Sequence, residues 1–235
     1  KRFTLQKAET RQVKNNAFYP HLTTVENFED LKKVAQFDHV PFKLRDDYSA
    51  EDVTNGKKNN WRSNENFVFA DVVFLDCDNK FSDGRAWFTP QELHKQFFPD
   101  VEMAVIYSRN NEKEKTNRNG EIESARPRFH VYFPLREKIT DPEILKGYKL
   151  EINANCFDVL ADPCAKAGTQ GCFGVENPSG FWFEGEKLID DVIPVNMGIK
   201  FEAELISLIF VKGLFFKLLS TKDLISSYLK CFNHL

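Results

Sequence analysis

The feature that most constrains the fold is an apolar run that ends in two closely spaced acidic residues, Val72-Val73-Phe74-Leu75-Asp76-Cys77-Asp78. Positions two apart on a strand point to the same side, so Asp76 and Asp78 are expected together at the end of a buried strand, with Cα atoms about 7 Å apart. Two like charges repel there unless a cation neutralises them. Hard divalent ions such as Mg²⁺ or Mn²⁺ prefer oxygen ligands of this kind and can also hold a triphosphate. The same spacing also occurs in sugar-nucleotide transferases and in ordinary strand-end turns, so these interpretations stay open.

Length and composition suit one full domain with an appendage, since the chain has 235 residues and is 42% hydrophobic. The net charge of −3 excludes a globally basic surface, although a local groove can be positive on an acidic protein. The five cysteines contain no Cys-x-x-Cys pair and predict reduced thiols in a cytoplasmic protein. We expect no signal peptide. We also expect no membrane helix, because the apolar run after residue 204 is short and carries Lys212 and Lys217.

Local patterns predict an order of helices and strands. The segment Thr23-Thr24-Val25-Glu26 has the form of a capping box, and apolar residues from Phe28 to Ala35 follow at helical spacing. Residues 45–65 are polar and predict a loop. From there the expected elements are a strand over 67–75, a helix opened by Thr89-Pro90-Gln91-Glu92, a strand over 101–107, a strand over 129–133, a helix from Thr140 towards Leu160, and short strands at 172–175, 181–183 and 188–193.

This order is the split βαβ pattern of ferredoxin-like and RNA-recognition-type (RRM-like) sheets. The fold class expected is therefore α+β, with a mostly antiparallel sheet, both helices on one face and the other face free for a site. The first and third strands are neighbours in this topology, so His130 can lie beside Asp76. We expect a domain over residues 1–195 with an N-terminal αβ extension, and a helical segment over 196–235.

The motifs together resemble the archaeo-eukaryotic primase superfamily, and most of all the primase-polymerases of prokaryotic mobile elements and phages. The resemblance rests on Asp76-Cys77-Asp78 after an apolar strand, on Arg126-Pro127-Arg128-Phe129-His130-Val131-Tyr132-Phe133, and on an Asp ahead of a Gly-containing strand. It spans about residues 60–195. Two positions depart from the family pattern: Arg128 stands where many members have Ser, and the third motif usually carries an Arg where this chain has Gln170 or Gly171.

The resemblance implies a template-dependent DNA primase or polymerase that transfers nucleotides from nucleoside triphosphates to a 3′-hydroxyl. Asp76, Asp78 and a third carboxylate would hold two Mg²⁺ or Mn²⁺ ions. Asp162 is preferred over Asp158 as the third, because Pro163 disfavours helical geometry at Asp162 and turns it towards the sheet. His130 would donate to a nucleotide phosphate, with Arg128, Arg126 and Arg62 as further nucleotide-binding residues. The implied partners are single-stranded DNA template and primer, and a helicase or other replication module.

Two other function classes stay open. A glycosyltransferase could use Asp76 and Asp78 to hold a sugar nucleotide, but such enzymes usually have a doubly wound parallel sheet. A catalytically inactive RRM-like module could bind nucleic acid without metal. The segment from Arg109 to Arg128 alternates basic and acidic residues, which predicts a solvated loop or, alternatively, a template contact; its basic residues include Lys113, Lys115 and Arg118.

Overall fold

The computed structural model describes residues 1–79, 87–117, 119–156 and 168–195, all within one compact unit, Lys1–Asn196. Several predicted features lie outside the described residues. They are the two candidates for the third carboxylate, Asp158 and Asp162, the loop residue Arg118, and the helical segment expected over 196–235.

The central sheet has five strands in the order β10-β6-β9-β5-β4. These are β4 (Lys43–Leu44), β5 (Phe67–Cys77), β6 (Met103–Tyr107), β9 (Phe129–Ile139) and β10 (Gly180–Phe183). All ladders in the described part of this sheet are antiparallel, which confirms the predicted α+β class and differs from the doubly wound pattern of a glycosyltransferase. The first and third strands of the split βαβ unit, β5 and β9, are neighbours as predicted. The last strand, β10, pairs with β6 at the far edge.

One face of the sheet packs against two helices, α3 (Pro90–Phe97) and α4 (Pro142–Asn155). Alternate residues of β5 and β9, among them Val73 and Val131, bury against Leu93 of α3 and Leu145 of α4. The predicted start of α3 is confirmed: the Thr89 hydroxyl accepts the Glu92 N–H, and the Glu92 carboxylate accepts the Thr89 N–H. This capping fixes where α3 begins.

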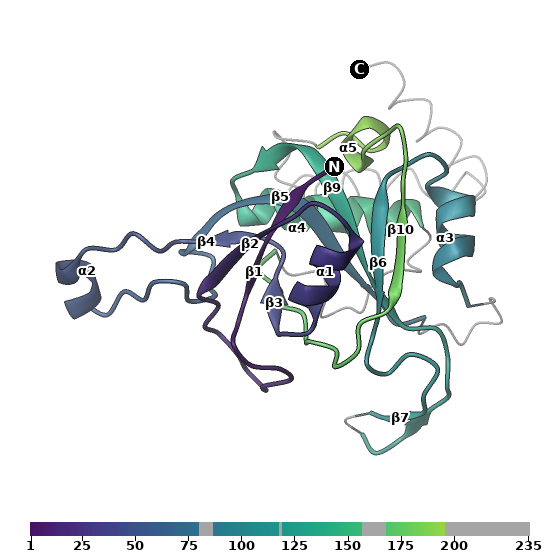
Figure 1. The fold of residues 1–235 in the computed structure, drawn as a ribbon, viewed down its shortest axis with the longest axis horizontal. Helices are drawn as coiled ribbons and strands as arrows, with labels where there is room; N and C mark the ends of the chain where they lie inside the picture. The colour runs from purple at the N-terminus through teal and green to yellow at the C-terminus, as the bar shows by residue number, and fades with distance from the viewer. Residues whose placement is uncertain (80–86, 118, 157–167, 196–235) are drawn as a thin grey trace, which may run out of the picture. The chain divides into compact units, whose positions relative to one another are not determined.

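The opposite face of the sheet is covered, contrary to the expectation that it would be free. A second sheet in the order β2-β1-β3, formed by β1 (Phe3–Lys7), β2 (His21–Val25) and β3 (His39–Val40), lies on this side with α1 (Phe28–Ala35). Figure 1 shows α1 and α4 on opposite sides of the central sheet. Leu5 and Leu31 are fully buried against Phe74 and Tyr132. β1 and α1 each have an apolar side, and these sides are buried against the face of β5 and β9 that is opposite α3 and α4.

Local differences from the predictions have local causes. Thr23, the first residue of the predicted capping box, does not cap a helix, because it pairs with Leu5 in the β1–β2 ladder. The cap of α1 is Asn27, whose side chain accepts the Asp30 N–H. The predicted strand over 188–193 is instead the short helix α5 (Ile189–Val192), where the Asp191 carboxylate accepts the Leu188 N–H at 2.8 Å.

Two segments predicted as loops carry short elements. Residues 45–65 contain α2 (Ala50–Thr54), which begins at a capping box between Ser49 and Asp52. The charged connection between β6 and β9 contains the hairpin of β7 (Lys115–Thr116) and β8 (Ile122–Glu123). In Figure 1 both α2 and β7 stand at the ends of long connections, away from the central sheet.

Candidate active site at the end of the central sheet

The site begins where β5 ends and β9 starts. The antiparallel register places Asp76 directly opposite His130, as the strand order predicted. The Nε2 atom of His130 lies 3.6 Å from Oδ1 of Asp76. The Asp76 side chain is 23% exposed, whereas that of His130 is 9% exposed. A carboxylate that reaches solvent therefore stands beside a nearly buried imidazole.

Asp78 follows β5 and is buried among basic side chains. Its Oδ1 lies 3.8 Å from Nε of Arg128, and its Oδ2 lies 3.5 Å from Nζ of Lys115. The backbone carbonyl of Asp78 accepts a hydrogen bond from Nε of Arg126 at 2.8 Å. Because the lysine is 34% exposed on the β7 hairpin, one of the two cations beside this carboxylate has room to move.

Arg128 is fully buried and ties the connection between β6 and β9 to this end of the sheet. Its Nη1 donates to the carbonyls of Asn110 and Lys113 at 2.9 and 2.7 Å. Its Nη2 donates to the carbonyl of Ser124 at 3.2 Å. A guanidinium suits this position because it carries five N–H donors in a rigid plane. The described contacts thus give Arg128 a structural task beside the nucleotide-binding role predicted for it.

Arg62 lies beside Gly171, in the segment ahead of β10 that crosses the covered face of the central sheet, here called the crossing segment. A methyl group at Gly171 would come within 3.2 Å of Nη1 of Arg62 and within 2.9 Å of the Tyr19 hydroxyl. Burial raises the pKa of Tyr19 to about 12, although the nearby charge of Arg62 opposes that rise. A glycine at position 171, one of the departures from the family pattern, therefore leaves room for the Arg62 guanidinium.

The sequence prediction missed Lys149, which α4 buries near Asp76. Its Nζ lies 5.8 Å from the centroid of the Phe74 ring. Burial lowers the pKa of Lys149 to about 7, while the charge of Asp76 opposes that shift. A signal was present in the sequence: Lys149 stands four residues after Leu145 and three before Ile152, on the apolar stripe of the helix.

A chain of buried side chains extends from His130 into the covered face. The Sγ atom of Cys172 lies 3.1 Å from Nδ1 of His130 and 3.8 Å from the Tyr132 hydroxyl. That hydroxyl lies 2.8 Å from Nε2 of His39. Burial lowers the pKa of His130 to about 3 and that of His39 to about 4, so both imidazoles are neutral at neutral pH. Burial also raises the pKa of the Cys172 thiol well above its ordinary value.

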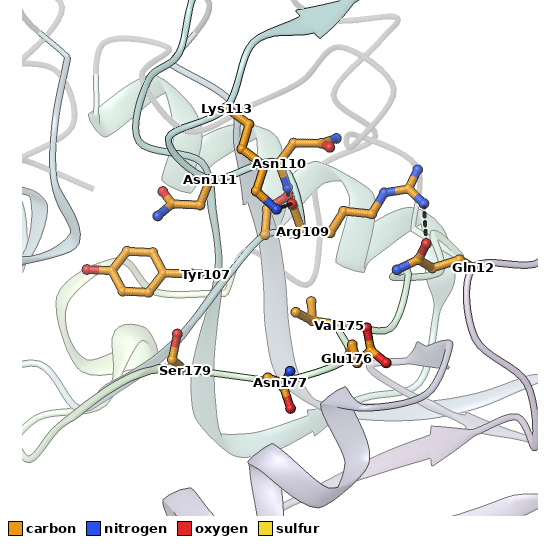
Figure 2. Close-up of a pocket in the computed structure, with 11 residues that line it drawn as sticks. Gln12, Tyr107, Arg109, Asn110, Asn111, Lys113, Val175, Glu176, Asn177 and Ser179 are labelled. Atoms are coloured by element: carbon orange, nitrogen blue, oxygen red, sulfur yellow. Dashed lines mark hydrogen bonds between the residues drawn. The ribbon is translucent and has the colours of Figure 1, made fainter.

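A polar pocket of about 600 Å³ opens at the same end of the sheet, beside β6 and β10. Figure 2 shows Arg109 pointing to Gln12, to which it donates at 3.1 Å, with Asn110, Asn111 and Lys113 above the opening. The Arg109 guanidinium also lies 4.9 Å from the centroid of the Phe173 ring. Since Arg128 holds the carbonyls of Asn110 and Lys113, the pocket and the acidic site share one wall.

Among the described residues, Asp76 and Asp78 are the two carboxylates predicted to bind a metal ion. No cluster of three or more His, Cys, Asp or Glu side chains that could hold an ion occurs in this part of the chain. Asp76 and Asp78 by themselves fit an ion that substrate phosphates also coordinate, since Mg²⁺ is commonly bound by one or two carboxylates plus phosphate oxygens. A second ion would need a further carboxylate, and the predicted one, Asp162, lies outside the described residues.

Comparisons with known proteins add little. No protein-family profile matches the chain, and no curated protein matches it. Among solved structures, the AEP domain of the primase-polymerase of cyanophage S-2L matches with a TM-score of 0.36 and 8% sequence identity, over 78% of this chain and 80% of that chain. Similarity at this level assigns neither family nor activity. Within the described residues, no helix has the length and apolarity to cross a membrane.

Proposed function

We propose that this domain catalyses template-dependent nucleotidyl transfer, adding nucleotides from nucleoside triphosphates to a 3′-hydroxyl on DNA. The observation that carries the proposal is the register of β5 and β9, in which Asp76 lies opposite His130 and Asp78 follows at the strand end. These residues belong to the motifs that resemble primase-polymerases, and antiparallel pairing brings them together from positions more than 50 apart in sequence.

The proposed roles follow from the chemistry of each side chain. Asp76 and Asp78, with Asp162 as the predicted third carboxylate, would hold two divalent ions, which when bound supply a lowered pKa at the 3′-hydroxyl and positive charge for the triphosphate. His130 is neutral and nearly buried, so it can donate one N–H to a phosphate oxygen. Arg62, Arg126 and Arg128 stay predicted nucleotide-binding residues, and the last two also shape the site through the Asp78 carbonyl and the β6–β9 connection.

The pocket beside the site suits a single strand of nucleic acid. Arg109 and Lys113 can neutralise backbone phosphates, and Tyr107 supplies an aromatic ring to the pocket lining on which a base can stack. This location supports the template-contacting alternative for part of the charged connection between β6 and β9. A helicase or other replication partner stays a prediction.

A second candidate function is nucleic-acid binding without catalysis. It is favoured by the surroundings of Asp78, because Arg128 and Lys115 already place two positive charges beside this carboxylate. In that case the ion pairs, rather than metal ions, would offset the repulsion between Asp76 and Asp78.

One experiment separates these functions. Labelled nucleotide incorporation is measured on single-stranded DNA, with and without a primer, in Mg²⁺ and in Mn²⁺, alongside binding of the same DNA. Asp76→Asn and Asp78→Asn should each lower incorporation by on the order of 100-fold or more while DNA binding persists. Asp162→Asn should behave in the same way, whereas Asp158→Asn should retain most activity. Asp47→Asn, at an exposed position away from the site, is the matched control.

Three outcomes decide the matter. Metal-dependent incorporation that both Asp76→Asn and Asp78→Asn abolish supports the polymerase. Salt-sensitive DNA binding with no incorporation by the wild-type protein identifies the non-catalytic module instead. Incorporation at wild-type rates by both variants shows that these carboxylates do no chemistry.

A further inference from the structure

The chain of hydrogen bonds behind His130 runs through Cys172 and Tyr132 and ends at His39. Nδ1 of His39 lies 2.9 Å from the carbonyl oxygen of Phe37, and a carbonyl can only accept. The imidazole of His39 is neutral, so it carries one proton, and that proton must be on Nδ1. Nε2 of His39 is then an acceptor. The hydroxyl of Tyr132, 2.8 Å away, must donate to it.

The next proton in the chain is that of the Cys172 thiol. Tyr132 donates its single hydroxyl proton to His39, so the Tyr132 oxygen can only accept a hydrogen bond from the Cys172 thiol. The possible acceptors for the thiol are Nδ1 of His130 at 3.1 Å, the carbonyl of Phe173 at 3.6 Å and the oxygen of Tyr132 at 3.8 Å. The imidazole nitrogen is the nearest and the most basic of the three.

The near end of the chain selects the same arrangement. Nε2 of His130 lies 3.6 Å from Oδ1 of Asp76, and a carboxylate only accepts. With the His130 proton on Nε2, an N–H points at the negative charge. With the proton on Nδ1, a bare nitrogen lone pair would face the carboxylate and repel it. The near end therefore places the His130 proton on Nε2, and the bare Nδ1 is then the nearest acceptor for the Cys172 thiol.

The position of Cys172 is itself well defined. Its backbone exchanges two hydrogen bonds with that of His39, of 2.7 and 3.0 Å, so the cysteine is anchored to β3. Its side chain is buried, and the residue is 4% exposed. An uncharged thiol that is fixed in this way serves as a donor of constant direction.

We propose that Cys172 is a positioning residue, whose thiol holds His130 in the tautomer that presents its Nε2–H to the candidate active site. This inference rests on the proposed function, in which the Nε2–H of His130 donates to a nucleotide phosphate. The Cys172 thiol keeps that N–H directed at the phosphate. The residue does not touch the substrate and acts only through the imidazole. The sequence predicted only that this cysteine is a reduced thiol, which gave no indication of such a role.

Nitrogen-15 spectra of histidine-labelled protein test the proposal directly. Long-range ¹H–¹⁵N correlations distinguish protonated from bare ring nitrogens, and His130→Gln identifies the signals of interest by their loss. In the wild-type protein, His130 should show a bare Nδ1 and a protonated Nε2. Cys172→Ser, which keeps a donor, should preserve this pattern. Cys172→Ala should shift the Nδ1 signal or give a mixture of tautomers.

The control is Cys156→Ala, because Cys156 is also a buried cysteine but belongs to the core on the other side of the sheet. It should leave the His130 signals unchanged. A proton on Nδ1 of His130 in the wild-type protein overturns the proposal without any variant, so it stays testable even if Cys172→Ala fails to fold. Identical His130 signals in Cys172→Ala and wild type overturn it as well.

Ligand titrations then connect the tautomer to the site. Cys172→Ala should weaken nucleoside triphosphate binding roughly 10-fold, with single-stranded DNA binding unchanged and with recovery in Cys172→Ser. Equal weakening for both ligands overturns the positioning role. If the wild-type protein binds no triphosphate at all, the proposed function fails, whereas the tautomer measurement still reports on Cys172.

Discussion

At the scale of single residues, burial decides which side chains of the site carry charge. His130 and His39 are neutral because their surroundings cannot solvate a cation, and the same cause brings the pKa of Lys149 to about 7. The burial of the Arg128 guanidinium is offset by hydrogen bonds from its two Nη atoms to the carbonyls of Asn110, Lys113 and Ser124. The permanent positive charge beside Asp78 is therefore supplied by arginine and by the partly exposed Lys115.

His39 makes the stability of the fold depend on pH. Its pKa is lowered to about 4 chiefly by burial, against the opposing influence of the Phe37 carbonyl and of Asp38, whereas an unfolded histidine titrates near 6.5. Between these values the unfolded chain binds more protons. The free energy of unfolding should thus fall by about 1.4 kcal/mol per pH unit from pH 6.5 down to about 4, and this contribution should level off below.

Urea unfolding at pH 7.5 and pH 5 measures this effect. His39→Gln removes the titrating group, so its stability should decrease less between the two pH values than that of the wild-type protein. Equal pH dependence in both proteins would contradict the prediction.

At the scale of elements, the connection between β6 and β9 is organised from one residue at its end. Arg128 directs its donors back to carbonyls at positions 110, 113 and 124, and its backbone N–H donates to Asn111 Oδ1 at 2.9 Å. The start of β9 is therefore also the anchor of the β7–β8 hairpin and of one wall of the pocket.

Removing that anchor should loosen the whole connection. Arg128→Met leaves several carbonyls and the Asp78 carboxylate without the guanidinium, and loss of one partner of a buried ion pair costs about 3–5 kcal/mol. We expect lower stability to urea and faster proteolysis between residues 108 and 127. Arg45→Met, at an exposed arginine, is the control and should change stability by no more than about 0.5 kcal/mol. Unchanged protease resistance in Arg128→Met would show that the connection is held by other contacts.

At the scale of the whole described unit, an N-terminal layer formed by β1, β2, β3 and α1 covers the face of the central sheet that contains His130. Asp38 joins this layer to the crossing segment: its Oδ1 accepts the backbone N–H groups of Gln12 and Gly174 at 2.7 and 2.9 Å, and its Oδ2 accepts that of Val13 at 3.0 Å. The residue Asp38 is 1% exposed, so these hydrogen bonds are shielded from water. The placement of Cys172 thus depends on contacts made by the first forty residues.

Asp38→Asn should weaken that junction, because an amide NH₂ would face N–H donors where the carboxylate now accepts them. Hydrogen bonds to charged groups contribute about 1.5–3 kcal/mol each, so we expect a loss of about 3 kcal/mol. Hydrogen exchange should become faster at the amides of residues 12, 13 and 174, with a smaller effect in the β5–β9 ladder. Asp47→Asn again serves as the exposed control. Uniform protection in Asp38→Asn and wild type would refute the assigned role.

The sequence alone was sufficient for the features that local interactions control. Runs of apolar and aromatic residues predicted β5 and β9, and the Thr89–Glu92 capping box predicted the start of α3, because these signals act within a few residues. The order of elements then placed His130 beside Asp76, since few topologies connect such strands. Short-range patterns were misleading where strand pairing competed with them, as at Thr23, whose pairing with Leu5 prevented a helix cap.

Only the tertiary structure decided what surrounds the site. The covered face of the sheet, the burial of Lys149 and the donors of Arg128 depend on contacts between segments far apart in the chain. The contact of Cys172 with His130 joins residues 42 positions apart, and that of His39 with Tyr132 joins residues 93 apart. No local pattern encodes such pairs, because their hydrogen bonds form only after the N-terminal layer has packed and excluded water from the face between them.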